Sequence, residues 1–161
     1  MIIRPARDND ADALWRVIEP TIRAGETYAL PRDMTRSAAL SYWMGPSQET
    51  FVVEDDGGGI VGTYSMRPNQ KGGGAHVANC GYMTRPDAIG CGIARAMGEH
   101  SLDHARARGF RAIQFNCVVS TNSRAVALWE RLGFRIVGTL PGAFAHPHHG
   151  FVDAYVMYRH L

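Results

Sequence analysis

The spacing of hydrophobic residues along the chain changes several times between a helical period and a strand period. An apolar stretch at residues 2–5 predicts a short strand. Thr35 or Ser37 stands where a side chain can cap a short helix that ends near Gly45. A longer helix is predicted before it, because five apolar residues recur every three or four positions: Ala13, Leu14, Val17, Ile18 and Ile22.

Three strands are predicted in the middle of the chain. Residues 50–54 and 60–66 are rich in β-branched and aromatic side chains and flank the glycine-rich turn 55–59, which favours a hairpin. A second glycine-rich turn at 71–74 leads into a third strand at 76–83. These three strands are therefore expected to be antiparallel neighbours.

The third strand is followed by a helix and then by another strand. Gly109 ends the helix, and residues 111–118 form the next strand. Strand, helix and strand in this order predict a right-handed crossover whose two strands are parallel. The helix has one apolar stripe, made of Ile93, Met97, Ser101, Leu102 and Ala105.

The last part of the chain continues this alternation. Asn122 or Ser123 is placed to cap a further helix. Two closing strands are expected at 134–138 and 152–158. Residues 141–150 are expected to form a long loop between them.

Composition narrows the class of protein. The chain has 161 residues, of which 45% are hydrophobic, and this fits a single domain over residues 1–161. The net charge is only +2, which argues against a nucleic-acid or membrane-surface partner and leaves a small molecule by default. No apolar run is long enough to span a bilayer, and residues 1–7 lack the apolar segment of a signal peptide. We therefore expect a cytoplasmic protein.

The cysteines and histidines do not follow a metal-binding pattern. Cys80, Cys91 and Cys117 lie far apart without paired spacing, which favours free thiols over a zinc site or a disulfide framework. The histidines at 146, 148 and 149 lie in a stretch rich in Pro and Gly, where solvated side chains are favoured over metal ligands. We expect no metal.

The stretch 88–95 is the strongest candidate for a binding site. Gly90 and Gly92 lie where a strand gives way to a helix. The first N–H groups of a helix lack internal partners, and the helix dipole adds about half a positive charge there. Such a terminus suits a phosphate or diphosphate. The alternative is that the two glycines only permit a tight turn.

Two stretches resemble motifs of the Gcn5-related N-acetyltransferases, and the resemblance extends over nearly the whole chain. The first motif is Arg or Gln, any two residues, Gly, any residue, and Gly or Ala, and it falls here on residues 89–94. The second is the run 122–134, with an Asn cap, an amphipathic helix and a closing Gly-Phe. The resemblance implies acetyl-CoA as co-substrate. It also implies an α/β (α+β) fold, with a mixed, mostly antiparallel sheet of about seven strands splayed at one parallel pair, and about four helices.

Two residues depart from those motifs. Ile89 stands where the family usually has Arg or Gln, which leaves Arg85 or Arg95 to supply a charge near the diphosphate. Trp129 stands where many members carry the Tyr that protonates the departing thiolate, and an indole N–H is not a usable acid.

A narrower likeness concerns acetyltransferases that act on proline analogues such as azetidine-2-carboxylate. The runs 67–69 and 76–82 are similar to those enzymes, as are the later asparagines. This resemblance implies that Asn79, Asn116 and Asn122 hold substrate or coenzyme.

The coenzyme site is expected to combine the strand before the glycine turn, the turn itself and the later Asn-capped helix. The N–H groups of the turn would hold the diphosphate, and the open edge of the strand would pair with the pantetheine amides. The alternative for Asn122 is a helix cap, and for Tyr82 a core position. The candidate residues are Tyr82, Met83, Gly90, Cys91, Gly92, Ile93, Ala94, Arg95, Asn122 and Trp129.

Candidates for the acceptor side come from other segments. Glu26, in the loop after the first helix, is the leading candidate for the general base, with a solvated surface Glu as the alternative. Tyr28 is a candidate substrate wall or proton donor, and Asn116, near the end of a parallel strand, completes the catalytic set. Asn79 and Tyr64 join Glu26 and Tyr28 as candidate substrate contacts, with a satisfied buried Asn and a core Tyr as the alternatives.

The reaction expected from these features is transfer of an acetyl group from acetyl-CoA to the amine of a small molecule, an amino acid or an analogue. We expect direct attack in a ternary complex, because neither Cys80 nor Cys117 has an adjacent His to activate it. The departures at Ile89 and Trp129 leave a non-catalytic acyl-CoA-binding module as one alternative. An acetyltransferase for proteins or peptides is another. The oligomeric state is open, with a homodimer as one option.

Overall fold

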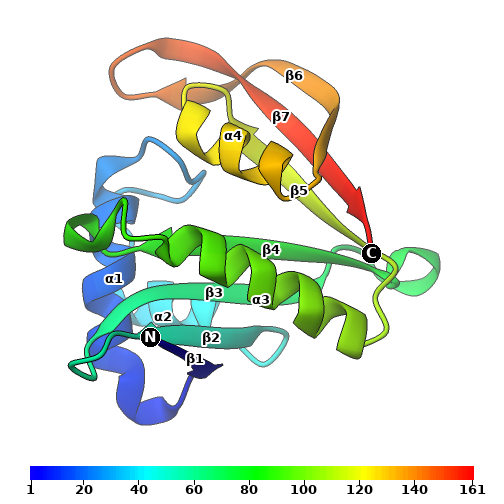
Figure 1. Cartoon of the computed structure of the whole chain (residues 1–161). Helices are drawn as coiled ribbons and strands as arrows, with labels where there is room; N and C mark the ends of the chain where they lie inside the picture. Colours follow the sequence, from blue (N-terminus) through cyan, green and yellow to red (C-terminus); the bar gives the residue numbers. More distant parts are fainter.

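The structure is a computed structural model that describes residues 1–161. Figure 1 shows a central sheet with helices on its two faces. The four helices are α1 (Ala11–Ala24), α2 (Arg36–Trp43), α3 (Ile93–Ala107) and α4 (Ser123–Arg131). The seven strands are β1 (Ile2–Pro5), β2 (Glu49–Glu54), β3 (Ile60–Pro68), β4 (Val77–Thr84), β5 (Ala112–Val119), β6 (Arg135–His146) and β7 (Gly150–His160).

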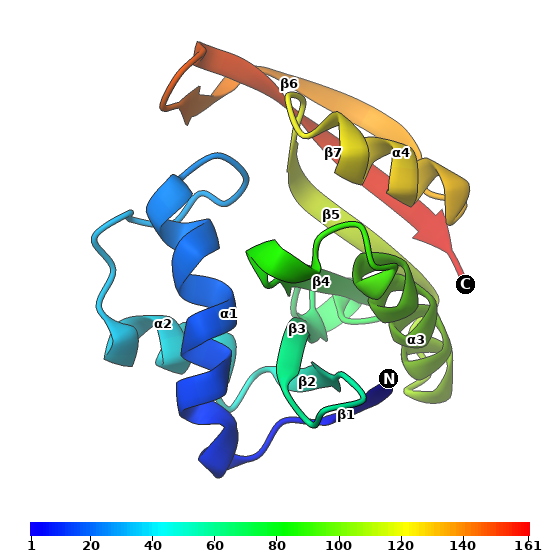
Figure 2. The ribbon, with the colours of Figure 1, turned by 60° about the vertical axis from the view of Figure 1, so that its left-hand side comes forward.

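All seven strands belong to one sheet in the order β1-β2-β3-β4-β5-β7-β6. Only β4 and β5 are parallel, and every other neighbouring pair is antiparallel. The pairing of β4 with β5 is short, because it joins only Val77 to Ala112 and Ala78 to Ile113. Beyond that point the two strands diverge, as Figure 2 shows. The predicted mixed sheet with one splayed parallel pair is therefore confirmed.

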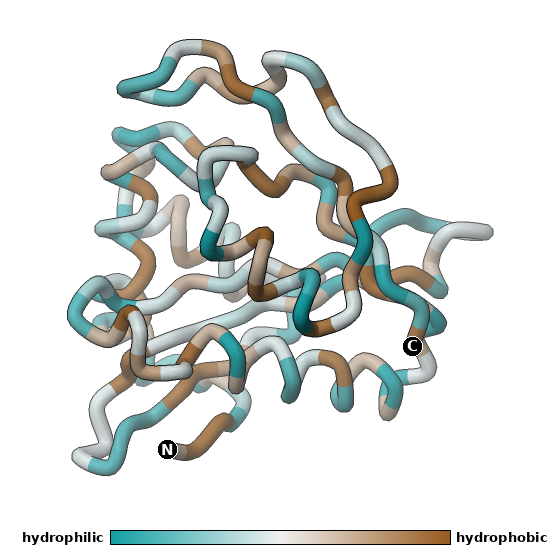
Figure 3. The backbone as a smooth tube through the Cα atoms, turned by 45° about the horizontal axis from the view of Figure 1, so that its top comes forward, coloured by the Kyte–Doolittle hydropathy of each residue, from teal (hydrophilic) through white to brown (hydrophobic).

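The two faces of the sheet carry separate hydrophobic cores. Eighteen buried residues form the core beneath α3 and α4, among them Met97 and Trp129. Nine form the core beneath α1 and α2, among them Leu14 and Trp43. Helices with one apolar side cover each face, and brown and teal segments alternate along them in Figure 3. No helix combines the length and the apolar character that a bilayer span requires.

Helices α2 and α4 begin where the sequence predicts caps. The Thr35 side chain accepts a hydrogen bond from the Ala38 N–H at the start of α2. Asn122 accepts one from the Ala125 N–H at the start of α4. Each cap gives a partner to one N–H group that the first helical turn leaves free.

The prediction of a long loop at residues 141–150 is wrong. Strand β6 extends to His146, and β7 begins at Gly150, so only a tight turn separates them. Pro141 lacks an N–H for pairing, but the register shifts between Leu140 and Phe144, so the proline lies in a bulge of an edge strand. The Asp153 carboxylate accepts a hydrogen bond from the Gly142 N–H within this bulge.

Candidate active site

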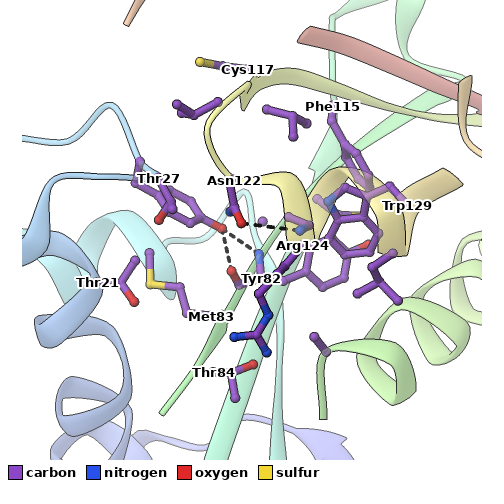
Figure 4. Close-up of a pocket in the computed structure, with 18 of the residues that line it drawn as sticks. Thr21, Thr27, Tyr82, Met83, Thr84, Phe115, Cys117, Asn122, Arg124 and Trp129 are labelled. Carbon is purple, nitrogen blue, oxygen red and sulfur yellow. Dashed lines mark hydrogen bonds between the residues drawn. The ribbon is translucent and has the colours of Figure 1, made fainter. Parts of the chain in front are cut away.

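A cavity of about 1180 Å³ occupies the region where β4 and β5 diverge. Its wall contains residues of both strands, of the N-terminal ends of α3 and α4, and of the segment after α1. Figure 4 shows side chains of Tyr82 and Thr84 from β4 around this space, together with the cap residue Asn122 and with Arg124 and Trp129 from α4. The cavity is thus assembled from segments on both faces of the sheet.

The N-terminus of α3 forms one end of the cavity. Gly90 and Gly92 both adopt a left-handed backbone, with φ of 92° and 79°, and both line the cavity. Residues with a Cβ rarely adopt this conformation, so the turn depends on glycine. The turn directs the first N–H groups of α3, which have no partner within the helix, at a site suited to an anion.

The edge of β4 that faces the cavity carries backbone groups that β3 does not use. The Asn69 N–H bonds to the Val77 carbonyl, and the Arg85 N–H bonds to the Val61 carbonyl. These two bonds fix the antiparallel alternation, so the N–H and C=O groups of Cys80, Tyr82 and Thr84 point away from β3. This open edge can pair with an extended chain of amides.

Tyr28 attaches the segment after α1 to this open edge. Its hydroxyl accepts a hydrogen bond from the Tyr82 N–H at 2.6 Å and donates one to the Tyr82 carbonyl at 2.9 Å. A Cβ on Gly81 would lie 3.1 Å from the Tyr28 hydroxyl and 3.2 Å from the Trp43 ring, so glycine permits this close approach. Burial raises the pKa of Tyr28 well above its ordinary value, and its hydroxyl therefore keeps its proton at neutral pH.

Polar side chains line the end of the cavity next to the short pairing of β4 with β5, which we call the closed end. They lie on the face of the sheet that carries α1 and α2. Arg67 on β3 is the register partner of Asn79 on β4. The Asn79 side-chain amide donates a hydrogen bond to the Gln114 carbonyl at 2.9 Å and so bridges the two diverging strands. Asn116 on β5 donates to the Asn69 side chain at 2.8 Å. These groups give the closed end several donors and acceptors.

The opposite side of the cavity is aromatic. The Trp129 ring lies 4.7 Å from the Tyr82 ring and 4.8 Å from the Phe115 ring, measured between centroids. The Tyr82 hydroxyl pairs with the Ser101 hydroxyl at 2.7 Å, and burial raises the pKa of Tyr82. Trp129 is 7% exposed and packs in the core beneath α4, yet it also lines the cavity.

Most of the residues predicted for the site lie together in the cavity wall. The members of the predicted set in the wall are Tyr28, Asn79, Tyr82, Met83, Gly90, Gly92, Ile93, Ala94, Arg95, Asn116, Asn122 and Trp129. Glu26, Tyr64 and Cys91 do not line it. The Glu26 carboxylate lies 3.6 Å from the His148 ring, the Tyr64 hydroxyl lies 2.7 Å from the His100 ring beneath α3, and Cys91 is exposed.

Several wall residues were not among the predicted site residues. Arg67 and Ser65 belong to β3, and strand alternation places both on the face of β3 that carries Thr63 and Trp43. A polar residue at every second position of an otherwise apolar strand is the signal that points to them. Arg124 and Arg131, from α4, also line the cavity, and both lie close in sequence to the predicted Asn122 and Trp129.

The fold and this site define an acetyltransferase. A family model described as the acetyltransferase (GNAT) family matches residues 14–134, and the chain belongs to this family. It is an acetyl-CoA-dependent N-acetyltransferase.

The relatives agree with this assignment. A Gcn5-related N-acetyltransferase from Kribbella flavida is 45% identical and superposes with a TM-score of 0.95, over 99% of this chain and 97% of that one. N-acetyltransferase aca1 from Schizosaccharomyces pombe is 29% identical over 87% of this chain and 75% of its own length. An acetyltransferase from Salmonella typhimurium, YncA, was solved with its cofactor acetyl-CoA. It shares the fold at 19% identity, with a TM-score of 0.88 over 100% of this chain and 94% of that one.

The cavity fits acetyl-CoA. The α3 N-terminus offers N–H groups to a diphosphate, and the backbone groups of Cys80 and Thr84 on the open edge of β4 offer partners to the pantetheine amides. The groups of Tyr82 on the same edge bond to the Tyr28 hydroxyl. Arg95 and Arg124 line the same side. Arg85 is the other candidate to supply the charge that Ile89 lacks. Its guanidinium forms an ion pair with Asp87 instead.

Proposed function

We propose that the acceptor is the amine of a small molecule, an amino acid or an analogue of one, and that it attacks the thioester directly in a ternary complex. The observation that carries this proposal is the polar closed end of the cavity, with Arg67, Asn79 and Asn116. Residues 27–30 line the same cavity, so the segment after α1 contributes to the acceptor side. A small polar molecule can form hydrogen bonds with several of these groups at once.

Bound acetyl-CoA supplies an activated acetyl group as a thioester. The chain's residues supply placement: the α3 turn and the β4 edge hold the coenzyme, while Asn79 and Asn116 orient the acceptor amine. A departing thiolate needs a proton, and the indole N–H of Trp129 is too weak an acid to supply it. We assign this proton to the Tyr28 hydroxyl because of its position at the open edge of β4.

The acceptor amine must lose a proton before or during attack. The cavity wall contains no Asp, Glu or His. A role for Glu26 as the base therefore requires bridging water, because its carboxylate faces His148 rather than the cavity. We propose that water removes the proton and that the pKa of the amine itself governs the pH dependence.

The family assignment excludes the non-catalytic acyl-CoA-binding module. One alternative remains distinct from this proposal. A protein or peptide acetyltransferase predicts acetylation of peptides with little turnover of free amines. A cytoplasmic location and a homodimer are also proposals, to be tested by fractionation and by light scattering.

The decisive experiment measures thiol release from acetyl-CoA with a panel of amino acids, their analogues and simple amines, beside a peptide array. Calorimetry measures acetyl-CoA binding on the same sample. Turnover of free amino acids or analogues, above turnover of peptides, is expected. Turnover confined to peptides would overturn the proposal and establish the protein acetyltransferase instead.

A further inference from the structure

The charged residues of the cavity wall are all of one sign. Four arginines line it, and no Asp, Glu, Lys or His does. Three of these arginines belong to the helices on the α3 and α4 face: Arg95, Arg124 and Arg131. These three are exposed and belong to the helices of the proposed coenzyme side. Arg67 is the fourth, and it belongs to the other face.

Arg67 lies at the closed end of the cavity, far from the phosphate turn. Its register partner Asn79 comes one residue after the last paired position of β4 with β5. From Asn79 to Thr84, where β4 ends and the segment leading to the turn begins, the strand extends about 17 Å at its usual rise per residue. Strand alternation places the Arg67 side chain with Ser65 and Thr63, on the face that carries α1 and α2. The Arg67 side chain therefore lies at the end of the cavity remote from the turn before α3.

The Arg67 side chain has no partner in the chain. The ion pairs and side-chain hydrogen bonds of the structure include many arginines, but not this one. It is half-buried, and the wall groups closest to it in the sheet, Ser65, Asn79 and Gly81, are uncharged. A half-buried guanidinium loses part of its hydration. An anion with two oxygens compensates for this loss by accepting two hydrogen bonds from it.

We infer that the acceptor carries a carboxylate or a similar anionic group near its amine, and that Arg67 binds this group. The inference rests on the proposed function, because it names the chemical class of the same acceptor. Arg67 holds the anionic end while the amine faces the point where β4 and β5 diverge. The positive wall disfavours polyamines and other multiply cationic acceptors, since like charges repel within the cavity.

The test compares α-amino acids with their carboxamides, which keep the amine and remove the charge. The wild-type protein should prefer the carboxylate, and Arg67→Met should lower kcat/KM for the carboxylate about 10- to 100-fold with little change for the carboxamide. Arg67→Lys should retain part of the preference, because it keeps the charge but loses the paired geometry. Arg135→Met is the matched control, since Arg135 is exposed on β6 and does not line the cavity.

A second measurement does not depend on turnover. Calorimetry of the CoA complex with N-acetyl amino acids, as carboxylates and as carboxamides, should show carboxylate binding that Arg67→Met abolishes and Arg135→Met retains. If such binding is found but no amine is acetylated, the proposed function fails and the anion subsite stands. Three results for Arg67→Met would overturn the inference. These are an equal loss of kcat/KM for carboxylate and carboxamide, no loss for either acceptor, and a raised KM for acetyl-CoA. Thermal unfolding followed by circular dichroism shows that each variant is folded.

Discussion

The two sides of the cavity are built by different means. On the side of α3 and α4, the proposed coenzyme site consists mainly of backbone: the N–H groups after Gly92 and the open edge of β4. On the side of α1 and α2, the proposed acceptor site consists of side chains, chiefly Arg67, Tyr28 and Asn79. Backbone groups are supplied by any sequence that forms the turn and the strand. The coenzyme side therefore defines a family, whereas the acceptor side defines the individual enzyme.

The largest effect is expected on the acceptor side, from loss of the Tyr28 hydroxyl. Tyr28→Phe should lower kcat about 100-fold and leave the KM for acetyl-CoA nearly unchanged, because it removes the proton donor for the thiolate. Steady-state kinetics with both substrates varied measures the two constants separately. Tyr42→Phe is the control, since Tyr42 also lines the cavity and is 40% exposed. Equal kcat in Tyr28→Phe and wild type would show that the proton comes from elsewhere.

The next effect should be confined to the coenzyme side. Gly92→Asp should raise the KM for acetyl-CoA about 30-fold, because a carboxylate at the α3 N-terminus repels the diphosphate. Gly92→Asn separates this charge effect from backbone strain. Gly109→Asp is the matched control, because Gly109 has a φ of 81° and open space around it, like Gly92, but does not line the cavity. An unchanged KM in folded Gly92→Asp would count against phosphate binding at this turn.

The same division explains what the sequence predicts well. The helix caps at Thr35 and Asn122, the glycine turn before α3 and the parallel crossover are local patterns, and the structure has each of them. Local patterns depend on residues a few positions apart, so their consequences can be read directly. The exception is the β6 extension, where Pro141 predicted a loop but lies in a bulge that the pairing with β7 tolerates.

The acceptor side depends on contacts between distant segments. Tyr28 and Tyr82 are 54 residues apart, and Asn69 and Asn116 are 47 apart. The sequence identified Tyr28, Asn79 and Asn116 as candidates but gave no means of separating them from Tyr64 and Glu26. A side chain lines the cavity only if the register of its strand or the course of its loop directs it there. Register and loop course are determined by the assembled sheet and not by the local sequence.

A smaller effect is expected for Glu26, and it bears on whether the acceptor side contains a base at all. Glu26→Gln should change kcat/KM less than about 3-fold, because the carboxylate is 45% exposed and its contact with the His148 ring lies at the surface. The logarithm of kcat/KM should rise with pH with a slope of about one, and this rise should end near the pKa of the amine used. A loss of about 100-fold in Glu26→Gln, together with loss of this rise, would instead identify Glu26 as the base acting through water.

The smallest effect should arise on the α3 face and concern stability rather than turnover. Burial, and then the nearby His104, lower the pKa of His100, while Asp103 acts in the opposite direction. The folded state therefore binds fewer protons than the unfolded state near pH 6, and stability falls as the pH decreases through that range. The His100 ring packs against Phe51 and forms a hydrogen bond with the Tyr64 hydroxyl at 2.7 Å.

His100→Gln should reduce the loss of Tm between pH 7 and pH 5 by about 1–2 °C, because it removes the group that gains a proton on unfolding. Calorimetric scans at several pH values measure the change of Tm with pH. His149 is an exposed histidine outside the α3 face, so His149→Gln should leave this change the same as in the wild type. Acid would then weaken the α3 face, and the KM for acetyl-CoA should rise before the KM for the acceptor does. A Tm slope identical to wild type in His100→Gln would show that the two faces lose stability to acid together, through groups other than this histidine.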